Sequence, residues 1–292
     1  MILIAGATGT LGFEICRLLA EKGKNIRTLT REASDPGKVA ALERLGAEVV
    51  RGDLKDRGSL DMACGGVETI VSTVSSTHSR GEGDGIDSVD RDGQINLIEA
   101  AKAAGASHFI YISFPEMAED SPLQDSKRAA EEALKRSGLT YTILQPTFFA
   151  EVWLSPALGF DAANGQARIY GAGENKISWI SYKDVAKFAA ESIDSPSARN
   201  AVIELGGPEA LSPNQVVSIF ENVAGRKFDV QYVPEEALRE QKATAEDQMQ
   251  KSFAGLMLSY AAGQPIDMRE TLQEFPIELT SVEEFAHSFV KT

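Results

Sequence analysis

The chain has 292 residues, of which 43% are hydrophobic and 25% charged, and its formal net charge is −14. This length and composition are ordinary for a soluble globular enzyme with one large domain or two. The negative charge repels nucleic acid and anionic membranes at long range, so we expect neither as a partner. No apolar run approaches the ~20 residues of a membrane span, and the opening run is too short for a signal peptide. We therefore expect a cytoplasmic protein.

The sequence offers no grouping of metal-binding or disulfide-forming residues. Cys16 and Cys64 are the only cysteines, there is no CxxC motif, and the histidines are not clustered near them. Zinc sites and disulfide frameworks need such spacing, so we expect no metal and no disulfide. Both cysteines are expected to be small buried side chains.

The first dozen residues combine a short apolar run, residues 1–5, with a glycine-rich turn, residues 6–12, that opens a helix. Gly6 would permit the tight turn, Gly9 would let the backbone approach a diphosphate, and Gly12 would let the helix pack closely on the sheet. The helix N-terminus would supply N–H groups to the anion. We expect a dinucleotide site here, and the alternative is tight packing of a strand on a helix.

Apolar segments with strand spacing alternate with helical segments through the first half of the chain. Strands are expected at 1–5, 25–30, 47–51, 69–74, 108–112 and 140–144, with helices between them. Such alternation is typical of βαβ units with right-handed crossovers. The predicted fold class is therefore α/β, a doubly wound parallel Rossmann sheet.

Two connecting segments have composition signals of their own. Residues 75–87 are rich in Ser, Gly and charge and cannot bury enough surface to fold alone, so we expect a mobile loop. A helix near Pro122 has an N-cap residue in Ser121 and a capping box completed by Gln124.

The alternation ends at Pro146, beyond which the chain is richer in glycine and aromatic residues. Strands are expected at 167–170, 177–180, 201–205 and 229–233, and helices at 183–193, 213–223 and through most of the C-terminal region. We expect residues 1–150 to form the NAD(P)-binding domain. Residues 151–292 would form a smaller α+β cap region that binds substrate and is partly interleaved with the sheet.

The predicted second strand ends at Arg31, about 20 residues after the glycine turn. An acidic residue at this position binds the ribose 2′-OH of NAD, whereas the forked guanidinium of an arginine suits a 2′-phosphate. Lys38 could add a second positive charge. NADP(H) is therefore favoured over NAD(H), and the alternative for Arg31 is a solvated charge at the end of a strand.

Asp53, at the end of the third strand, could accept a hydrogen bond from the adenine amino group, or it could cap the following helix. Residues at the end of the fourth strand would lie beside the ribose and phosphate. The full expected cofactor set is Gly6, Thr8, Gly9, Thr10, Leu11, Gly12, Arg31, Lys38, Asp53, Leu54, Thr73, Val74, Ser75, Lys127, Pro146 and Phe148.

Lys127 lies on the apolar stripe of its predicted helix, with Leu123 and Leu134, where a solubilising charge does not belong. It could contact a ribose hydroxyl, or act as a proton donor with a lowered pKa. The alternative is a snorkelling lysine paired with Glu131. Ser113, after the fifth strand, would face the same crevice, so Lys127 and Ser113 are the candidate catalytic residues.

Four aromatic residues follow the fifth and sixth strands: Phe114, Phe148, Phe149 and Trp153. They could form an apolar wall for a flat substrate, or they could be core between the sheet and its cap. His78, in the 75–87 loop, could approach a substrate, with a solvent-exposed histidine as the alternative.

The glycine turn 6–12, Arg31, the segment 52–54 and the stretch 126–146 together resemble the NmrA-like family of atypical short-chain dehydrogenases. The resemblance spans nearly the whole chain. It implies a Rossmann domain with a smaller C-terminal region. Some members are NAD(P)H-dependent reductases of quinones, dyes or related aromatics, and others bind NADP as redox sensors without turnover.

This chain departs from the family pattern at two positions. Ordinary short-chain dehydrogenases place a catalytic tyrosine four residues before the lysine, where this chain has Leu123. Family members often have arginine before the proline of the sixth strand, where this chain has Gln145, and that removes one possible anion contact. Because Leu123 cannot donate a proton, alcohol dehydrogenase or sugar epimerase chemistry is disfavoured.

The predicted function is NAD(P)H-dependent reduction of a small conjugated acceptor such as a quinone, whose product oxyanion can take its proton from water or Lys127. One alternative is a non-catalytic NADP-binding sensor that acts through a protein partner. Another is a reductase or isomerase of a different metabolite. A monomer or a homodimer is expected.

Overall fold

The computed structural model describes residues 1–77 and 81–290, and it divides the chain into two compact units. The first unit contains residues 1–114, 125–145 and 185–203, and the second contains residues 115–124, 146–184 and 204–292. Residues 185–203 follow position 150 in the sequence and yet belong to the first unit. His78 lies outside the described residues.

The first unit is built on a seven-stranded sheet in the order β3-β2-β1-β4-β5-β6-β9. The neighbouring pairs from β3 to β6 are all parallel. The strands are β1 Ile2–Ala5, β2 Ile26–Thr30, β3 Glu48–Arg51, β4 Thr69–Ser72, β5 His108–Ile112, β6 Thr140–Pro146 and β9 Ala201–Leu205. The strand order reverses between β1 and β4, where a doubly wound sheet binds its ligand. The predicted α/β fold class is confirmed.

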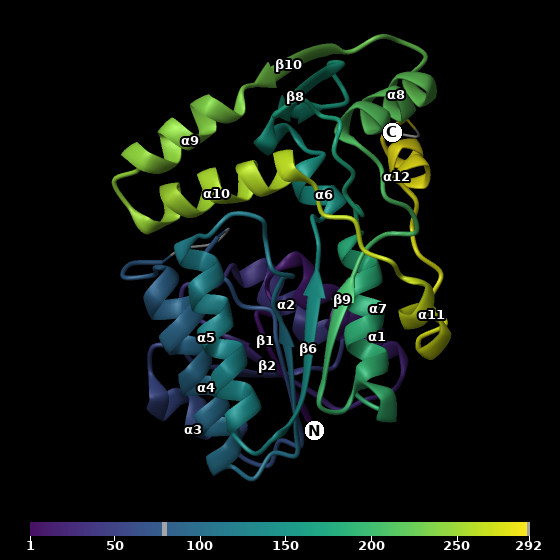
Figure 1. Cartoon of the computed structure of the whole chain (residues 1–292). Coiled ribbons are helices and arrows are strands. Elements are labelled where there is room, and N and C mark those ends of the chain that lie inside the picture. Colours follow the sequence, from purple (N-terminus) through teal and green to yellow (C-terminus); the bar gives the residue numbers. More distant parts are fainter. Residues whose placement is uncertain (78–80, 291–292) are drawn as a thin grey trace. The chain divides into compact units, whose positions relative to one another are not determined.

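Helices cover both faces of this sheet. Figure 1 shows α3, α4 and α5 together on one side of it, and α1 and α7 on the other. The helices are α1 Thr10–Glu21, α2 Pro36–Arg44, α3 Arg57–Cys64, the π-helix η1 Ile86–Arg91, α4 Asp92–Ala103, α5 Pro122–Arg136 and α7 Tyr182–Ser192. Because both faces are covered, the central strands β1, β4 and β5 are buried along their whole length. Cys16 and Cys64 are buried free thiols, as expected.

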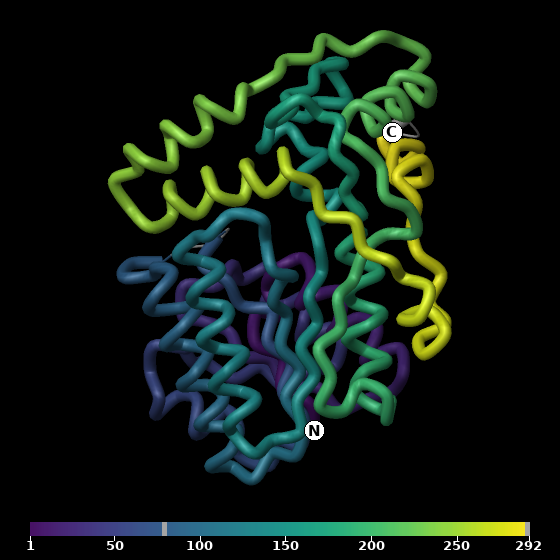
Figure 2. The backbone as a smooth tube through the Cα atoms, viewed as in Figure 1, coloured from purple at the N-terminus to yellow at the C-terminus, as the bar shows by residue number. Residues whose placement is uncertain are grey.

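The second unit contains a three-stranded sheet, β10-β8-β7, and most of the C-terminal helices. Its further elements are α6 Ala150–Trp153, β7 Phe160–Asp161, β8 Gln166–Tyr170, α8 Pro213–Ala224, β10 Asp229–Val233, α9 Glu235–Thr244, α10 Gln248–Ala262, α11 Arg269–Glu274 and α12 Val282–Val290, with 3-10 turns at Pro156–Leu158 and, in the first unit, at Pro196–Ala198. Figure 2 shows the backbone running out along α9 and back along α10. The aromatic residues of this unit supply much of its core.

Three local expectations differ from the structure. Residues 177–180 form isolated bridges to Phe149, Leu211 and Gln264 rather than a strand. The capping box before α5 is half formed, because the Gln124 side chain accepts from the Met117 N–H at 2.7 Å while the Gln124 N–H donates to Ser121. The end of the 75–87 segment enters the π-helix η1, which its polar composition did not reveal.

Candidate functional site

The glycine turn between β1 and α1 has no room for side chains at two of its three glycines. A Cβ on Gly6 would lie 2.4 Å from the Thr73 Oγ1, and Gly6 also has a φ of +87°, which favours glycine. A Cβ on Gly12 would lie 2.2 Å from the Gly6 carbonyl oxygen. The backbone of the turn therefore packs closely against Thr73, which follows β4, and against the first turn of α1.

The outer side of this turn is open to an anion. Gly9 and Thr10 are exposed, and Thr8 and Leu11 are half-buried. Gly9 is the N-cap of α1 and offers no side-chain acceptor, and no acidic residue lies in the first turn. The N–H groups and positive dipole of this helix end are thus not neutralised by the helix's own side chains. The residues present fit the pyrophosphate of a dinucleotide.

Arg31 follows β2 directly and lies at the same sheet edge as the glycine turn, because β1 and β2 are parallel neighbours with Ala5 opposite Leu29. Its guanidinium forms an ion pair with the carboxylate of Asp84. Lys55, which follows β3, donates to the other oxygen of Asp84 at 2.5 Å. Arg31 is therefore part of a cluster of charges and not an isolated solvated residue.

The other two charged candidates near this edge differ in their surroundings. Lys38 is exposed in the first turn of α2, and its backbone N–H donates to Asp35, the N-cap of that helix. Asp53 accepts from the Lys55 N–H at 2.8 Å and its second oxygen lies 3.9 Å from the Lys55 Nζ. The N-cap of α3 is Asp56, so the helix-capping alternative for Asp53 is wrong.

The candidates at the end of β4 and in the 52–54 segment are held by local contacts. The Thr73 hydroxyl donates to the Ala5 carbonyl at 3.2 Å, and the Ser75 Oγ lies 3.2 Å from the Thr77 Oγ1. Val74 packs against the main core. Leu54 is 6% exposed and belongs to that core, so its side chain has a packing role.

Lys127 on α5 is 4% exposed, and its Nζ lies 3.5 Å from the Oδ1 of Asp90 and 5.1 Å from the centre of the Tyr111 ring. Burial alone would lower the pKa of Lys127, but the Tyr111 hydroxyl and the Asp90 carboxylate outweigh it and raise that pKa. The expectation of a lowered pKa is therefore wrong. The expected pairing with Glu131 is also wrong, since Glu131 contacts Arg128 and Gln145.

Ser113 is 6% exposed, and within the described part of the chain its Oγ has no hydrogen-bond partner. Ser113 and Tyr111 are two residues apart at the end of β5, so their side chains share a face of the sheet. Leu123, at the position of the catalytic tyrosine of ordinary short-chain dehydrogenases, is 3% exposed. The Gln145 side chain donates to Glu131 at 2.9 Å, which gives it a structural partner.

The four aromatic candidates have different environments, and each is described within its own unit. Phe114, in the first unit, is half-buried beneath the Arg128 guanidinium. Phe148, in the second unit, is 2% exposed and packs edge-on against Trp153 and Tyr260. Phe149 and Trp153 are half-buried. Phe148 therefore occupies a core position, because a substrate wall needs an accessible ring, and the adjoining Pro146 is buried as well.

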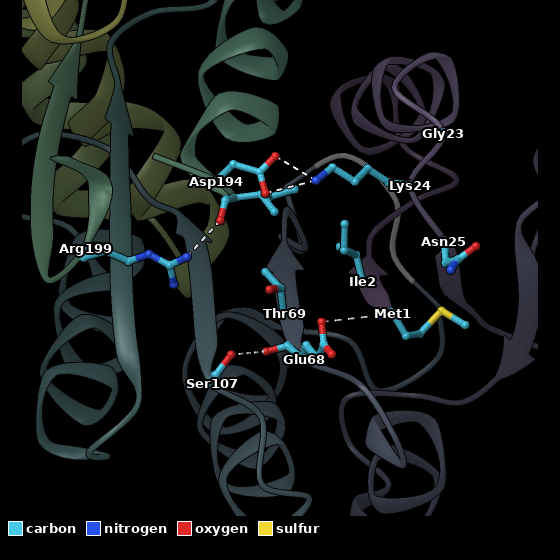
Figure 3. Close-up of a pocket in the computed structure, with 11 residues that line it drawn as sticks. Met1, Ile2, Gly23, Lys24, Asn25, Glu68, Thr69, Ser107, Asp194 and Arg199 are labelled. Atoms are coloured by element: carbon cyan, nitrogen blue, oxygen red, sulfur yellow. Dashed lines mark hydrogen bonds and ion pairs between the residues drawn. The ribbon is translucent and has the colours of Figure 1, made fainter. Parts of the chain in front are cut away.

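A cavity of about 340 Å³ lies at the amino ends of the strands of the first unit's sheet, opposite the end that carries the glycine turn. Figure 3 shows Met1, Ile2, Thr69 and Ser107, from the starts of β1, β4 and β5, beside Lys24 and its partner Asp194. Parallel sheets bind ligands at the carboxyl ends of their strands, so this cavity is not the predicted cofactor site.

The described residues contain neither a metal-binding group nor a membrane-spanning helix. Among residues 1–77 and 81–290 no group of three His, Cys, Asp or Glu side chains could hold a metal ion. In the same residues no helix is both long and apolar enough to cross a membrane.

The NmrA-like family model matches residues 1–286. This chain belongs to the NmrA-like family. It is 32% identical over 270 residues to the NAD(P)H azoreductase of Xenophilus azovorans, covering 91% of this chain and 88% of that protein. It is 30% identical to a photosystem II assembly factor of Synechocystis sp., covering 82% of this chain and 72% of that protein.

The fold of this family member is also found among solved structures. The NADPH-dependent quinone oxidoreductase of Escherichia coli, solved with NADPH, covers the whole of both chains with a TM-score of 0.77 and 24% identity. A Rossmann sheet with a smaller second unit is therefore shared with this oxidoreductase.

Four residues of the site region were missed by the sequence interpretation: Lys55, Asp84, Asp90 and Tyr111. Lys55 carried one available signal, because it lies at the same sheet edge as Asp53. Asp84 and Asp90 lie in a polar stretch and a π-helix whose contacts come from tertiary structure. Tyr111 could have been noted as a polar aromatic residue two positions before Ser113.

Proposed function

We propose that this protein is an NAD(P)H-dependent reductase of a small conjugated acceptor such as a quinone, with NADP(H) favoured over NAD(H). One observation carries the proposal: two cationic side chains, Arg31 and Lys55, meet on one carboxylate at the sheet edge that bears the tight glycine turn. Such a pair suits the 2′-phosphate that distinguishes the two cofactors.

Bound NAD(P)H supplies a hydride to an acceptor. The backbone N–H groups of Gly9, Thr10 and Leu11 would bind the pyrophosphate, while Arg31 and Lys55 would bind the 2′-phosphate. Asp53 remains the candidate for the adenine. Thr73 and Ser75 remain the candidates beside the ribose.

The polar residues near the end of β5 favour an acceptor that needs no strong acid from the protein. Leu123 cannot donate a proton, and the raised pKa of Lys127 makes its ammonium group a weak acid at neutral pH. Hydride transfer to a quinone leaves a hydroquinone monoanion, which is stabilised by its own conjugation and can take its one remaining proton from water. Lys127 then has a positioning role towards a ribose hydroxyl, and the unpaired Ser113 hydroxyl is the group left to contact the acceptor.

The names of two similar proteins support this assignment. The azoreductase of Xenophilus azovorans and the quinone oxidoreductase of Escherichia coli are both named for reducing conjugated acceptors with a nicotinamide cofactor. Phe114 of the first unit, which holds the proposed cofactor site, remains a candidate for contact with such an acceptor because it is half-buried.

A second candidate function is a non-catalytic NADP-dependent sensor with a protein partner. The observation that favours it is the Synechocystis relative, which is named as an assembly factor. NADPH binding without turnover of any acceptor, together with a partner captured only in the presence or only in the absence of NADP, would support the sensor over the reductase.

The test of the proposal compares NADPH with NADH on the wild-type protein and on Arg31→Ala. NADPH affinity, measured by cofactor fluorescence, should fall by about tenfold or more in the variant, while NADH affinity stays within about twofold, because only NADPH has the 2′-phosphate. Equal loss for both cofactors would refute the role of Arg31. Lys102→Ala, at an exposed lysine on α4 outside the expected cofactor set, is the cation control and should leave both affinities nearly unchanged.

Turnover is tested separately by following NADPH oxidation with quinones, azo dyes and triphenylmethane dyes. A reductase should oxidise NADPH at a rate that depends on the acceptor and its concentration. No oxidation with any acceptor class, from a protein that binds NADPH, would overturn the reductase assignment while leaving the cofactor assignment intact.

A further inference from the structure

The carboxylate of Asp84 is almost completely enclosed by donors. Its side chain is 2% exposed. One oxygen contacts the Arg31 guanidinium and accepts from the Gly81 N–H at 2.6 Å, and the other accepts from the Lys55 Nζ at 2.5 Å. Lys55 also donates to the Glu82 carbonyl at 3.0 Å, so the 81–84 segment is fixed to this site twice.

The donors that hold Asp84 come from the elements that would bind the 2′-phosphate. Arg31 follows β2 and Lys55 follows β3, and these two strands are parallel neighbours with Thr30 opposite Arg51. Both cations therefore lie beyond the carboxyl ends of the strands. A carboxylate and a phosphate oxygen pair accept the same fork of hydrogen bonds from a guanidinium. Asp84 thus occupies donors of the kind that a 2′-phosphate requires.

Within the group formed by Arg31, Lys55, Asp84 and Asp53, the two carboxylates offset the two cations. Arg31 and Lys55 contribute two positive charges, and Asp84 and Asp53 contribute two negative charges, with Asp53 3.9 Å from the Lys55 Nζ. A phosphate dianion approaching this group meets no net attraction, and it must either displace the carboxylate or accept a position beside it. Both routes weaken its binding.

We propose that Asp84 is an internal competitor for the 2′-phosphate and that Lys55 is the second cation of that phosphate site, so that Asp84 limits the preference for NADPH over NADH. This inference rests on the proposed function, because it takes the Arg31 edge as the 2′-phosphate site. The competing anion is a side chain of the protein itself, so its effective concentration at the phosphate site is set by the fold.

Asp84 stays charged over the whole range in which the protein would work. Burial alone would raise the pKa of its carboxyl group, but the hydrogen bonds from Lys55 and Gly81 and the Arg31 guanidinium outweigh burial and lower that pKa. The Asp84 carboxylate is therefore charged at neutral pH, and a pH dependence of the competition comes from the phosphate, whose second pKa is about 6.

The experiment measures dissociation constants of NADPH, NADH and 2′,5′-ADP for the wild-type protein and Asp84→Asn. Removing one charge about 6 Å from a dianion in a solvent-like dielectric should tighten NADPH about tenfold. The effect on 2′,5′-ADP should be the same, and NADH should change by less than about twofold. Glu82→Gln removes an equal charge two positions away, on an exposed residue, and should leave all three constants nearly unchanged. Unchanged or weaker NADPH binding to Asp84→Asn would overturn the proposal, because Asp84 would then orient Arg31 for the phosphate.

Two further variants keep the failures distinguishable. In an Arg31→Ala background the gain from Asp84→Asn should shrink to less than about threefold, since the shared donor is gone. Lys55→Met should weaken NADPH and 2′,5′-ADP selectively, and equal effects on NADH would refute the role of Lys55. If Arg31→Ala alone does not separate NADPH from NADH, the proposed cofactor site fails. If it does separate them and Asp84→Asn does not tighten NADPH, only the competitor fails.

Discussion

The buried ion pair between Lys127 and Asp90 allows a quantitative test of how the first unit is held together. The side chains are 6% and 0% exposed, and the Nζ lies 3.5 Å from the Asp90 Oδ1. The second Asp90 oxygen accepts from the Ser76 N–H at 3.0 Å and from the Ser76 hydroxyl at 2.6 Å. Asp90→Asn can keep these two bonds through its amide oxygen, but it then turns an NH₂ group towards the lysine.

Removing one partner of a buried pair leaves an uncompensated charge and costs about 3–5 kcal/mol. We expect a loss in this range for Asp90→Asn and also for Lys127→Met. The double variant removes both charges and should lose less than the sum, with a coupling energy of about 2–3 kcal/mol. For a chain of 292 residues, whose entropy of unfolding is about 0.6 kcal/mol/K, the single losses correspond to a fall in Tm of about 5–8 °C.

The assay is urea unfolding of the wild type, both single variants and the double variant at one pH near 7.5. Lys102→Met, on an exposed lysine of α4, is the control and should stay within about 0.5 kcal/mol of wild type. Because the folded-state pKa of Lys127 is raised, the pair's contribution is fully present below the usual lysine value of about 10.4 and is lost as the pH rises through the folded value. Stability from this pair should therefore be constant between pH 7 and 9.

An additive cycle, with coupling below about 0.5 kcal/mol, would show that the two groups do not interact in solution. A near-neutral Asp90→Asn would show that the carboxylate is replaceable by an amide. Either result would refute the Asp90 carboxylate as a cause of the raised pKa of Lys127.

Two more predictions concern buried rings. Phe148→Ala should lower the free energy of unfolding by about 3–5 kcal/mol, because the ring packs within the aromatic core of the second unit. Thermal and urea unfolding measure this loss. A raised KM for an aromatic acceptor at unchanged Tm would instead place Phe148 at the acceptor site. Burial, with the nearby charge of Arg199, lowers the pKa of His108 to about 4, so the unfolded chain takes up a proton first and stability falls as the pH drops below about 6.5. His108→Gln should reduce this loss by about 1–2 kcal/mol between pH 7 and pH 5, and an identical pH slope in the variant would contradict the assignment.

The sheet could be predicted because its strands carry their own signal. Strands buried on both faces require continuous apolar runs, and residues 2–5, 69–72 and 108–112 consist mainly of such residues. The 177–180 segment has the same apolar character, yet it forms only single bridges. Composition shows that such a segment is buried, but it does not show whether a neighbouring strand is available to pair with it.

The candidate site could be predicted only where local geometry determines it. Gly6 and Gly12 are required by contacts within the turn and with the adjoining strand, and these follow from spacing along the chain. The partner of Lys127 follows from tertiary contacts instead. Helical spacing offered Glu131, four residues away, whereas the structure pairs Lys127 with Asp90, which a π-helix presents from before α4. A π-helix has no reliable composition signal, and such segments are frequent at functional sites.

Tyr111 lies beside Lys127, which raises the question of whether it replaces the tyrosine missing at position 123. Its side chain is fully buried, its hydroxyl finds no hydrogen-bond partner among the described residues, and burial raises its pKa to about 12. A phenol that is sealed from solvent and this weakly acidic cannot deliver a proton to an acceptor and be reprotonated. Tyr111 therefore contacts Lys127 through its ring, whose centre lies 5.1 Å from the Nζ. This leaves the proposed chemistry with acceptors whose reduced form is stable as an anion, and an alkyl ketone, whose alkoxide needs a proton at once, should not be reduced.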